Sequence, residues 1–140
     1  MEKKLTILIA DKNPHVRDFL MREMMKEGYC IRLAKNGREV LKRAYDPDLV
    51  DILILDLDLP HADEIEEIME KLSRRFPPLP VVIHSFLSDY NNHLDTLNAA
   101  AYVEKEGDSI DRLKEVVSEL LGNFNQPGFD KSEKAIHPVR

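Results

Sequence analysis

The stretch Asp51-Ile52-Leu53-Ile54-Leu55-Asp56-Leu57-Asp58-Leu59-Pro60 contains an unbroken apolar run that ends on an acid. An unbroken run, instead of an alternating one, is typical of a strand whose two faces are both covered by helices. Ligands collect at the carboxyl ends of such strands, so the residue that closes the strand is a candidate functional residue. The stretch therefore predicts a parallel strand with the Asp56 carboxylate at its carboxyl end.

Further apolar runs surround this strand in the sequence, and segments with helical spacing alternate with them. The predicted strands are Leu5–Ala10, Tyr29–Ala34, Val50–Leu55, Pro80–His84 and Ala101–Glu104. The predicted helices run from Asn13-Pro14 to Gly28 with an apolar face of Val16, Phe19, Leu20 and Met24, from Asn36-Gly37 to Asp46-Pro47, from Ile65 to Pro77-Pro78, from about Asp89 to Ala100, and from Asp108 to Gly122. Five strand–helix pairs in strict alternation predict an α/β fold, a doubly wound five-stranded parallel sheet with right-handed crossovers.

Composition limits the classes of protein to which the chain can belong. Its 26 acidic and 20 basic residues give a formal net charge of −6, which opposes sequence-independent binding to nucleic acid. No apolar run approaches the ~20 residues that cross a bilayer, and the N-terminal run is too short for a signal peptide. The single cysteine, Cys30, excludes an internal disulfide and is expected to be a small buried residue. We expect one cytoplasmic domain over residues 1–121 and a flexible tail or truncated linker over 122–140.

Polar side chains stand at the ends of four predicted strands. Asp11 follows the first strand, Asp56 the third, Ser85 the fourth and Lys105 the fifth. A carboxylate can accept a phosphoryl group when a divalent cation and an ammonium neutralise the incoming oxygens, and Mg²⁺ is usually held by one or two carboxylates. This chemistry would make Asp56 the acceptor, Asp11 a metal-site carboxylate, Ser85 a hydroxyl that follows the phosphoryl group and Lys105 its counter-ion. Taken alone, each acid could instead be a turn or cap residue, and the lysine could be solvated.

From about Lys3 to Leu121, the sequence resembles the receiver domains of bacterial two-component response regulators, the CheY-like superfamily. The residues that carry the resemblance are Ile7–Asp11, Asp51–Pro60, Leu79–Ser85 and Ala101–Lys105. The combination of these features, in this order, is specific. It consists of an acid that closes an apolar strand with proline four residues later, a strand that ends on a hydroxyl residue, and a strand that ends in Tyr-x-x-Lys.

The resemblance implies a flavodoxin-like strand order of 2-1-3-4-5 and phosphorylation of Asp56 by a sensor histidine kinase or a phosphotransfer protein. It implies Mg²⁺ bound by Asp11, Asp56 and the main-chain carbonyl of Asp58. It also implies that Ser85 and Tyr102 reposition as the domain switches. The surface of the fourth helix, fifth strand and fifth helix would then engage an output protein or a second copy of the chain, with no nucleic acid or membrane contacted directly.

Lys12 departs from the family pattern, which usually has a second acid at this position. The three acids Asp11, Asp56 and Asp58 with Lys12 and Lys105 sum to about −1, whereas an acid at position 12 would give about −3. We hypothesise that Mg²⁺ binds more weakly than usual and that Lys12 supplies part of the metal's electrostatic role. A Lys12 that points into solvent, and an Asp58 that either replaces the missing carboxylate or pairs with Lys12, remain open alternatives.

Phe86 is the second departure, because the family usually has a small residue after the strand-four hydroxyl. We expect its ring to crowd the path to Asp56, with slow phosphoryl transfer from small donors and slow loss by hydrolysis. Beyond such slow autodephosphorylation we expect no enzymatic activity.

Parts of the sequence also bear on three functions other than that of a phosphorylated receiver. Lys12 and Phe86 leave open a degenerate receiver that binds partners without phosphorylation. The spacing of Asp56 and Asp58 is similar to the Asp-x-Asp motif of haloacid-dehalogenase phosphatases, although that motif normally closes the first strand. A nucleotide or flavin binder is disfavoured, because the loop Asp11–His15 has no glycines to cradle a phosphate.

Overall fold

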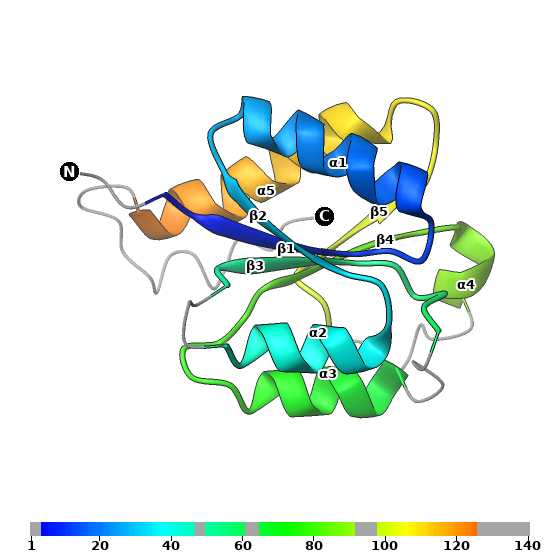
Figure 1. The fold of residues 1–140 in the computed structure, drawn as a ribbon, viewed down its shortest axis with the longest axis vertical. Coiled ribbons are helices and arrows are strands. Elements are labelled where there is room, and N and C mark those ends of the chain that lie inside the picture. Colours follow the sequence, from blue (N-terminus) through cyan, green and yellow to red (C-terminus); the bar gives the residue numbers. More distant parts are fainter. Residues whose placement is uncertain (1–3, 47–49, 61–64, 92–97, 126–140) are drawn as a thin grey trace.

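A parallel sheet forms the centre of the molecule (Figure 1). The computed structural model describes residues 4–46, 50–60, 65–91 and 98–125, and within them the sheet is five-stranded in the order β2-β1-β3-β4-β5. The strands are β1 (Thr6–Ala10), β2 (Cys30–Ala34), β3 (Ile52–Leu55), β4 (Val81–Ser85) and β5 (Ala101–Glu104). Both the architecture and the strand order confirm the expectation from the sequence.

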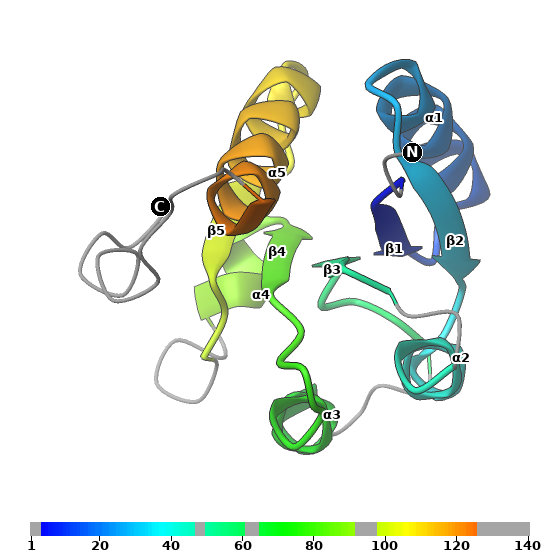
Figure 2. The ribbon, with the colours of Figure 1, turned by 90° about the vertical axis from the view of Figure 1, so that its left-hand side faces the viewer.

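Helices cover both faces of this sheet, as Figures 1 and 2 show. They are α1 (Pro14–Lys26), α2 (Gly37–Ala44), α3 (Ile65–Ser73), α4 (Leu87–Asn91) and α5 (Ser109–Asn125). Helices α1 and α5 lie on one face, and α2 and α3 lie on the other. The pairs Ala10↔Leu55, Leu55↔Ile83 and Ser85↔Glu104 keep the strands in register, so that their carboxyl ends meet at one edge.

Two buried clusters, one on each face, explain why the strands are apolar throughout. Ile7, Ile9 and Ile54 pack with α1 and α5, whereas Leu8 and Leu53 pack with α2 and α3. Successive strand side chains point to opposite faces, so a strand covered on both sides needs an apolar residue at every position. Burying each of these side chains contributes about 1.5–3 kcal/mol to the stability of the fold.

Local signals in the sequence start and end the first two helices. The Asn13 side chain accepts hydrogen bonds from the main-chain N–H groups of His15 and Val16, and the Asn36 side chain accepts one from Glu39. Such caps satisfy main-chain donors that the first helical turn leaves free. After α1 the chain turns at Gly28, whose φ of 95° favours glycine because it has no Cβ.

The third, fourth and fifth helices differ from the sequence-based boundaries. Helix α3 ends at Ser73, before the predicted stop at Pro77-Pro78. Helix α4 begins at Leu87, and residues 98–100 are not helical; the Ala100 N–H instead donates to Val81 O at 2.8 Å as the chain enters β5. The predicted segment between these parts, 92–97, lies outside the described residues. Helix α5 continues past Gly122 to Asn125, because a glycine inside a helix costs only about 1 kcal/mol and no proline stops it there. The remainder of the predicted tail, 126–140, is likewise outside the described residues.

The exposure of Cys30 and the character of the helices complete the description of the fold. The prediction for Cys30 is wrong: its side chain is exposed, because it is the first residue of the edge strand β2. Among the described helices, none has the length and apolar character that a membrane span requires.

Candidate functional site

Four polar side chains meet at the carboxyl edge of the sheet, as their strand-end positions predict. Asp11 is 1% exposed, Asp56 3% and Ser85 0%, and the Lys105 ammonium lies among them. They come from the ends of β1, β3, β4 and β5, which the register of the parallel sheet brings together. The structure therefore groups residues that are up to 94 positions apart in sequence, from 11 to 105.

The loop after β1 holds Asp11 in a fixed orientation. The Asn13 N–H donates to Asp11 Oδ1 at 2.9 Å, and Arg17 Nη1 donates to the Asp11 carbonyl oxygen at 2.6 Å. Asn13 and Arg17 thus tie the loop to the first turns of α1. This leaves Asp11 Oδ2 directed to the centre of the site, where it contacts Lys105.

The Asp56 carboxylate accepts hydrogen bonds from three groups. Its Oδ1 accepts from Ser85 Oγ and from the Asp58 N–H, each at 3.1 Å, and its Oδ2 accepts from Lys105 Nζ at 3.1 Å. The Asp56 main-chain N–H donates to Ala10 O at 2.9 Å, which fixes the backbone beside β1. Both oxygens of the carboxylate are therefore aligned by donors, a preorganised arrangement for a nucleophile or a metal ligand.

Lys105 bridges the two buried acids. Its Nζ lies 2.9 Å from Asp11 Oδ2 and 3.1 Å from Asp56 Oδ2. Burial raises the pKa of Asp11, and this outweighs the hydrogen bond from Lys105 that lowers it. Burial alone would lower the pKa of Lys105, but the two carboxylates outweigh it and the pKa is raised. The ammonium therefore stays charged, and with two acids to one base the inner site keeps an excess of negative charge when both acids are ionised.

Lys12 and Asp58 form a second contact, on the outer side of the same edge. Lys12 Nζ donates to Asp58 Oδ2, and both side chains are about half exposed, at 51% and 56%. The hydrogen bond with Asp58, more than any other cause, raises the pKa of Lys12. Of the alternatives left open by the sequence, the structure therefore has the pairing: Lys12 contacts Asp58, and the Asp58 carboxylate is engaged with it.

Phe86 lies directly beside the inner cluster. Its side chain is 56% exposed, and the Lys105 ammonium lies 5.5 Å from the centre of its ring. At this distance the cation is attracted to the face of the ring, a contact that adds about 0.5–1 kcal/mol at exposed sites. The ring is thus placed against the counter-ion of Asp56 and on the side open to solvent.

Tyr102 connects the cluster to helix α4. Its hydroxyl donates to Ser85 O at 3.3 Å, and burial raises its pKa. Its ring stacks on that of Tyr90 in α4, with centroids 4.1 Å apart and planes at 15°. Tyr90 was not singled out from the sequence, because nothing in the pattern of α4 shows which of its residues faces β5.

His84 is a buried residue behind the site. Its Nε2 lies 3.1 Å from Ser109 Oγ in α5, and it faces away from Asp56, as the alternation along β4 predicts. The pKa of His84 is lowered to about 4, chiefly by burial and next by the charge of Lys105. His84 is therefore neutral at pH 7.

The donor set can be compared with the needs of Mg²⁺. Within the described residues, no group of three or more His, Cys, Asp and Glu side chains that could hold a metal is found. Two carboxylates, those of Asp11 and Asp56, do converge on one point, where Lys105 contacts both. Mg²⁺ typically takes one or two protein carboxylates and completes its shell with carbonyl, water and phosphate oxygens, so the residues present fit this ion.

Comparisons with known proteins agree with this geometry. The family model described as "Response regulator receiver domain" matches residues 7–118. Response regulator MprA of Mycolicibacterium vanbaalenii is 30% identical over 95 residues, which are 68% of this chain and 40% of MprA. Response regulator RR06 of Streptococcus pneumoniae is 29% identical over 85 residues, 61% of this chain and 38% of RR06. The chain thus spans well under half the length of these curated relatives.

A solved structure supports the same assignment. The response regulator protein TrrA from Thermotoga maritima, in complex with Mg²⁺–BeF, superimposes with a TM-score of 0.72 and is 31% identical. The alignment covers 83% of this chain and 98% of that protein. The Asp-x-Asp phosphatase interpretation gains no support from these comparisons, and Asp56 closes the third strand instead of the first.

Proposed function

Since the chain belongs to the family of response regulator receiver domains, we propose that Asp56 accepts a phosphoryl group from a sensor histidine kinase or a phosphotransfer protein. The observation that carries the proposal is the triple contact of the Asp56 carboxylate with Ser85, Lys105 and the Asp58 N–H, beside the second carboxylate of Asp11. A buried, oriented carboxylate with a fixed ammonium suits a reaction in which negative oxygens arrive and must be neutralised.

In the proposed step, one Asp56 oxygen attacks the phosphorus of a phosphohistidine. The new P–O bond forms as the P–N bond breaks, and the bonding pair returns to the imidazole nitrogen. Lys105 neutralises an incoming phosphoryl oxygen. Ser85 Oγ lies 3.1 Å from Asp56 Oδ1 and would be close enough to donate a hydrogen bond to another phosphoryl oxygen. Mg²⁺, held by Asp11, Asp56 and the Asp58 main-chain carbonyl, would supply further positive charge at the phosphoryl oxygens.

Ser85 also links this chemistry to a partner surface. Its side chain contacts Asp56, whereas its main-chain oxygen accepts from the Tyr102 hydroxyl. A shift of Ser85 toward a phosphoryl group would alter the Tyr102 contact and the stack on Tyr90, at the junction of α4 and β5. We propose that an output protein or a second copy of the chain binds the α4–β5–α5 surface in response, in the cytoplasm.

The test is phosphorylation of the purified protein with acetyl phosphate and Mg²⁺, followed by intact mass. The wild type should gain one phosphoryl group, and Asp56→Asn should gain none. Asp58→Asn is the matched control, because it removes a neighbouring carboxylate and leaves the acceptor, and it should still be labelled. Labelling of Asp56→Asn would assign the acceptor elsewhere.

The second candidate function is a receiver that binds partners without phosphorylation. The Lys12–Asp58 contact favours it, because it places an ammonium beside the proposed metal site. It predicts no adduct with acetyl phosphate and no conformational change with beryllofluoride and Mg²⁺. Intact mass after treatment with acetyl phosphate, and circular dichroism with and without beryllofluoride and Mg²⁺, therefore separate the two functions when measured on the wild type.

We propose that Phe86 slows two reactions, the transfer of a phosphoryl group from small donors to Asp56 and its loss by hydrolysis. Its half-exposed ring stands beside Lys105, on the side from which a small donor or a hydrolytic water would approach. Because the substitution opens this approach, Phe86→Ala should speed both labelling by acetyl phosphate and loss of the phosphoryl group by about tenfold. Phe76→Ala, which removes a 91% exposed ring elsewhere, is the control for a general surface effect. Unchanged rates in Phe86→Ala would contradict this role.

A further inference from the structure

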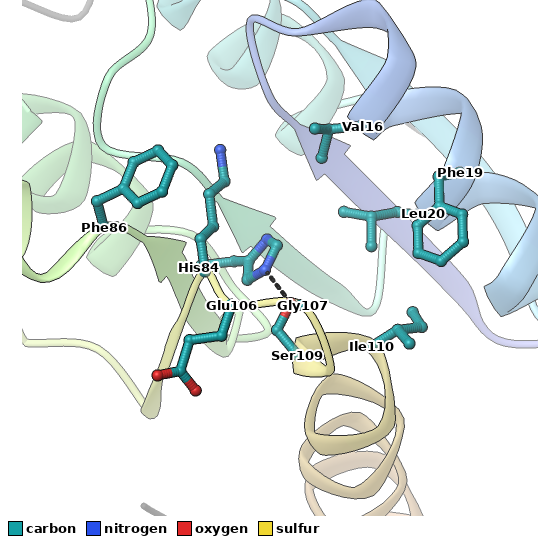
Figure 3. Close-up of a pocket in the computed structure, with 10 residues that line it drawn as sticks. Val16, Phe19, Leu20, His84, Phe86, Glu106, Gly107, Ser109 and Ile110 are labelled. Carbon is teal, nitrogen blue, oxygen red and sulfur yellow. Dashed lines mark hydrogen bonds between the residues drawn. The ribbon is translucent and has the colours of Figure 1, made fainter.

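A cavity of about 410 Å³ lies between α1 and the start of α5 (Figure 3). Its walls come from α1, from the end of β4 and from the loop that joins β5 to α5, and they include neither Asp11 nor Asp56. The volume falls within the range of about 300–1,000 Å³ that is typical of small-molecule sites. The cavity is therefore large enough for an organic ligand and separate from the phosphoacceptor carboxylate.

Most of the wall is apolar and includes two aromatic rings that remain partly exposed. Phe19 is 42% exposed although the sequence placed it on the apolar face of its helix, and Phe86 is 56% exposed. Figure 3 shows these rings on opposite sides of the His84 imidazole, with Val16 and Leu20 of α1 nearby. A flat apolar molecule between them would cover aromatic surface that the fold itself leaves in water.

One corner of the cavity is polar. His84 Nε2 contacts Ser109 Oγ at 3.1 Å, and among the described residues His84 Nδ1 has no hydrogen-bond partner although it is buried. A hydroxyl can donate and accept at once, so Ser109 keeps capacity for a second hydrogen bond. His84 Nδ1 is closed to solvent, so the half-buried Ser109 hydroxyl at the wall is the group that could pair with one polar group of a ligand.

The charges at the cavity favour a neutral ligand. The Lys105 ammonium is already paired with two carboxylates, so it offers little free positive charge to an anion. Glu106 adds a carboxylate at the wall, which Figure 3 shows turned away from the imidazole. An anionic ligand would therefore meet unfavourable charge, whereas an uncharged one would not.

We propose that this cavity binds a small neutral aromatic molecule of one or two rings with a single hydroxyl or ring N–H group. The polar group lies at the His84–Ser109 corner, and the rings lie against Phe19 and Phe86. This binding goes beyond the phosphoryl chemistry proposed above and does not depend on it. Because Phe86 and Lys105 belong to the cavity wall, an occupant would contact residues that also adjoin Asp56.

The test uses 2-naphthol and naphthalene as probes, titrated into unphosphorylated protein and followed by amide chemical shifts. We expect chemical-shift changes at Val16, Leu20, Gly107 and Ile110. We also expect 2-naphthol to bind about three- to tenfold more tightly than naphthalene, because one net hydrogen bond contributes this much to affinity. Shifts absent or confined to other parts of the molecule would overturn the proposal. Equal affinities of the two probes would overturn the role of the polar corner.

Two variants sharpen the result. Ser109→Ala removes the hydroxyl of the corner and should reduce the preference for 2-naphthol to less than about twofold. Ile110→Trp fills the cavity and should abolish binding of both probes, whereas Phe76→Ala lies outside it and should change neither. Binding that survives Ile110→Trp in a folded variant would place the site elsewhere. Because no phosphorylation is involved, failure here would leave the role of Asp56 untouched.

Discussion

Two lysine–aspartate contacts lie at the same edge of the sheet and differ in burial. The Lys105 side chain is 13% exposed and contacts Asp11 and Asp56, whereas Lys12 is 51% exposed and contacts Asp58. Water screens an exposed pair, but removing one partner of a buried pair leaves a charge without compensation. The inner contact therefore stabilises the site, whereas the outer contact mainly sets its electrostatic potential.

Replacement of Lys105 is expected to have the largest effect on stability. Lys105→Met should lower the free energy of unfolding by about 3 kcal/mol at pH 7, because two buried carboxylates then face each other without a cation. Urea denaturation measures the loss, which should shrink as pH falls and Asp11, whose pKa is raised by burial, takes up a proton. Lys12→Met is the matched control and should leave the unfolding free energy unchanged within error. Equal losses in both variants would show that burial does not distinguish the two contacts.

His84 is a second buried group near Lys105, and a proton on its ring would place another positive charge in the interior. Its pKa is about 4 in the folded protein against 6.5 ordinarily. Below pH 6.5 the unfolded chain binds a proton that the folded protein does not, so stability falls as pH falls from 6.5 to 4. The full loss attributable to His84 is roughly 3 kcal/mol.

His84→Gln cannot take up this proton and should lose less stability across the same pH range. The measurement is urea denaturation of both proteins at several pH values, because their difference cancels the carboxylates that they share. Parallel curves would show that His84 titrates alike in the folded and unfolded chains.

The smallest effect concerns the outer contact and metal affinity. Lys12→Asp should tighten Mg²⁺ binding by about tenfold, since it replaces a cation near the proposed ligands with an anion. Titration calorimetry measures the affinity, and the gain should fall as ionic strength rises. Lys42→Asp makes the same change of charge on α2, in its last turn at the opposite edge, and should have little effect. Equal Mg²⁺ affinities of wild type and Lys12→Asp would show that the charge of residue 12 has no effect on metal binding.

The sequence determined the fold and most members of the site. Unbroken apolar runs and helical spacing gave five strands and five helices, because burial on both faces requires apolar residues at every strand position. Parallel strands end at one edge, so Asp11, Asp56, Ser85 and Lys105 could be grouped from their positions alone. Asn13, Asn36 and Gly28 marked helix ends correctly, since caps depend on local chemistry.

The tertiary structure decided what depends on contacts between distant segments. Periodicity could not show that Cys30 begins an edge strand, that Phe19 stays partly exposed or that Tyr90 stacks on Tyr102. It also left open whether Lys12 contacts Asp58 or solvent, because two side chains 46 positions apart meet only when β1 and β3 pair. Local sequence fixes what each segment is, whereas packing between segments fixes which side chains meet and which remain in water.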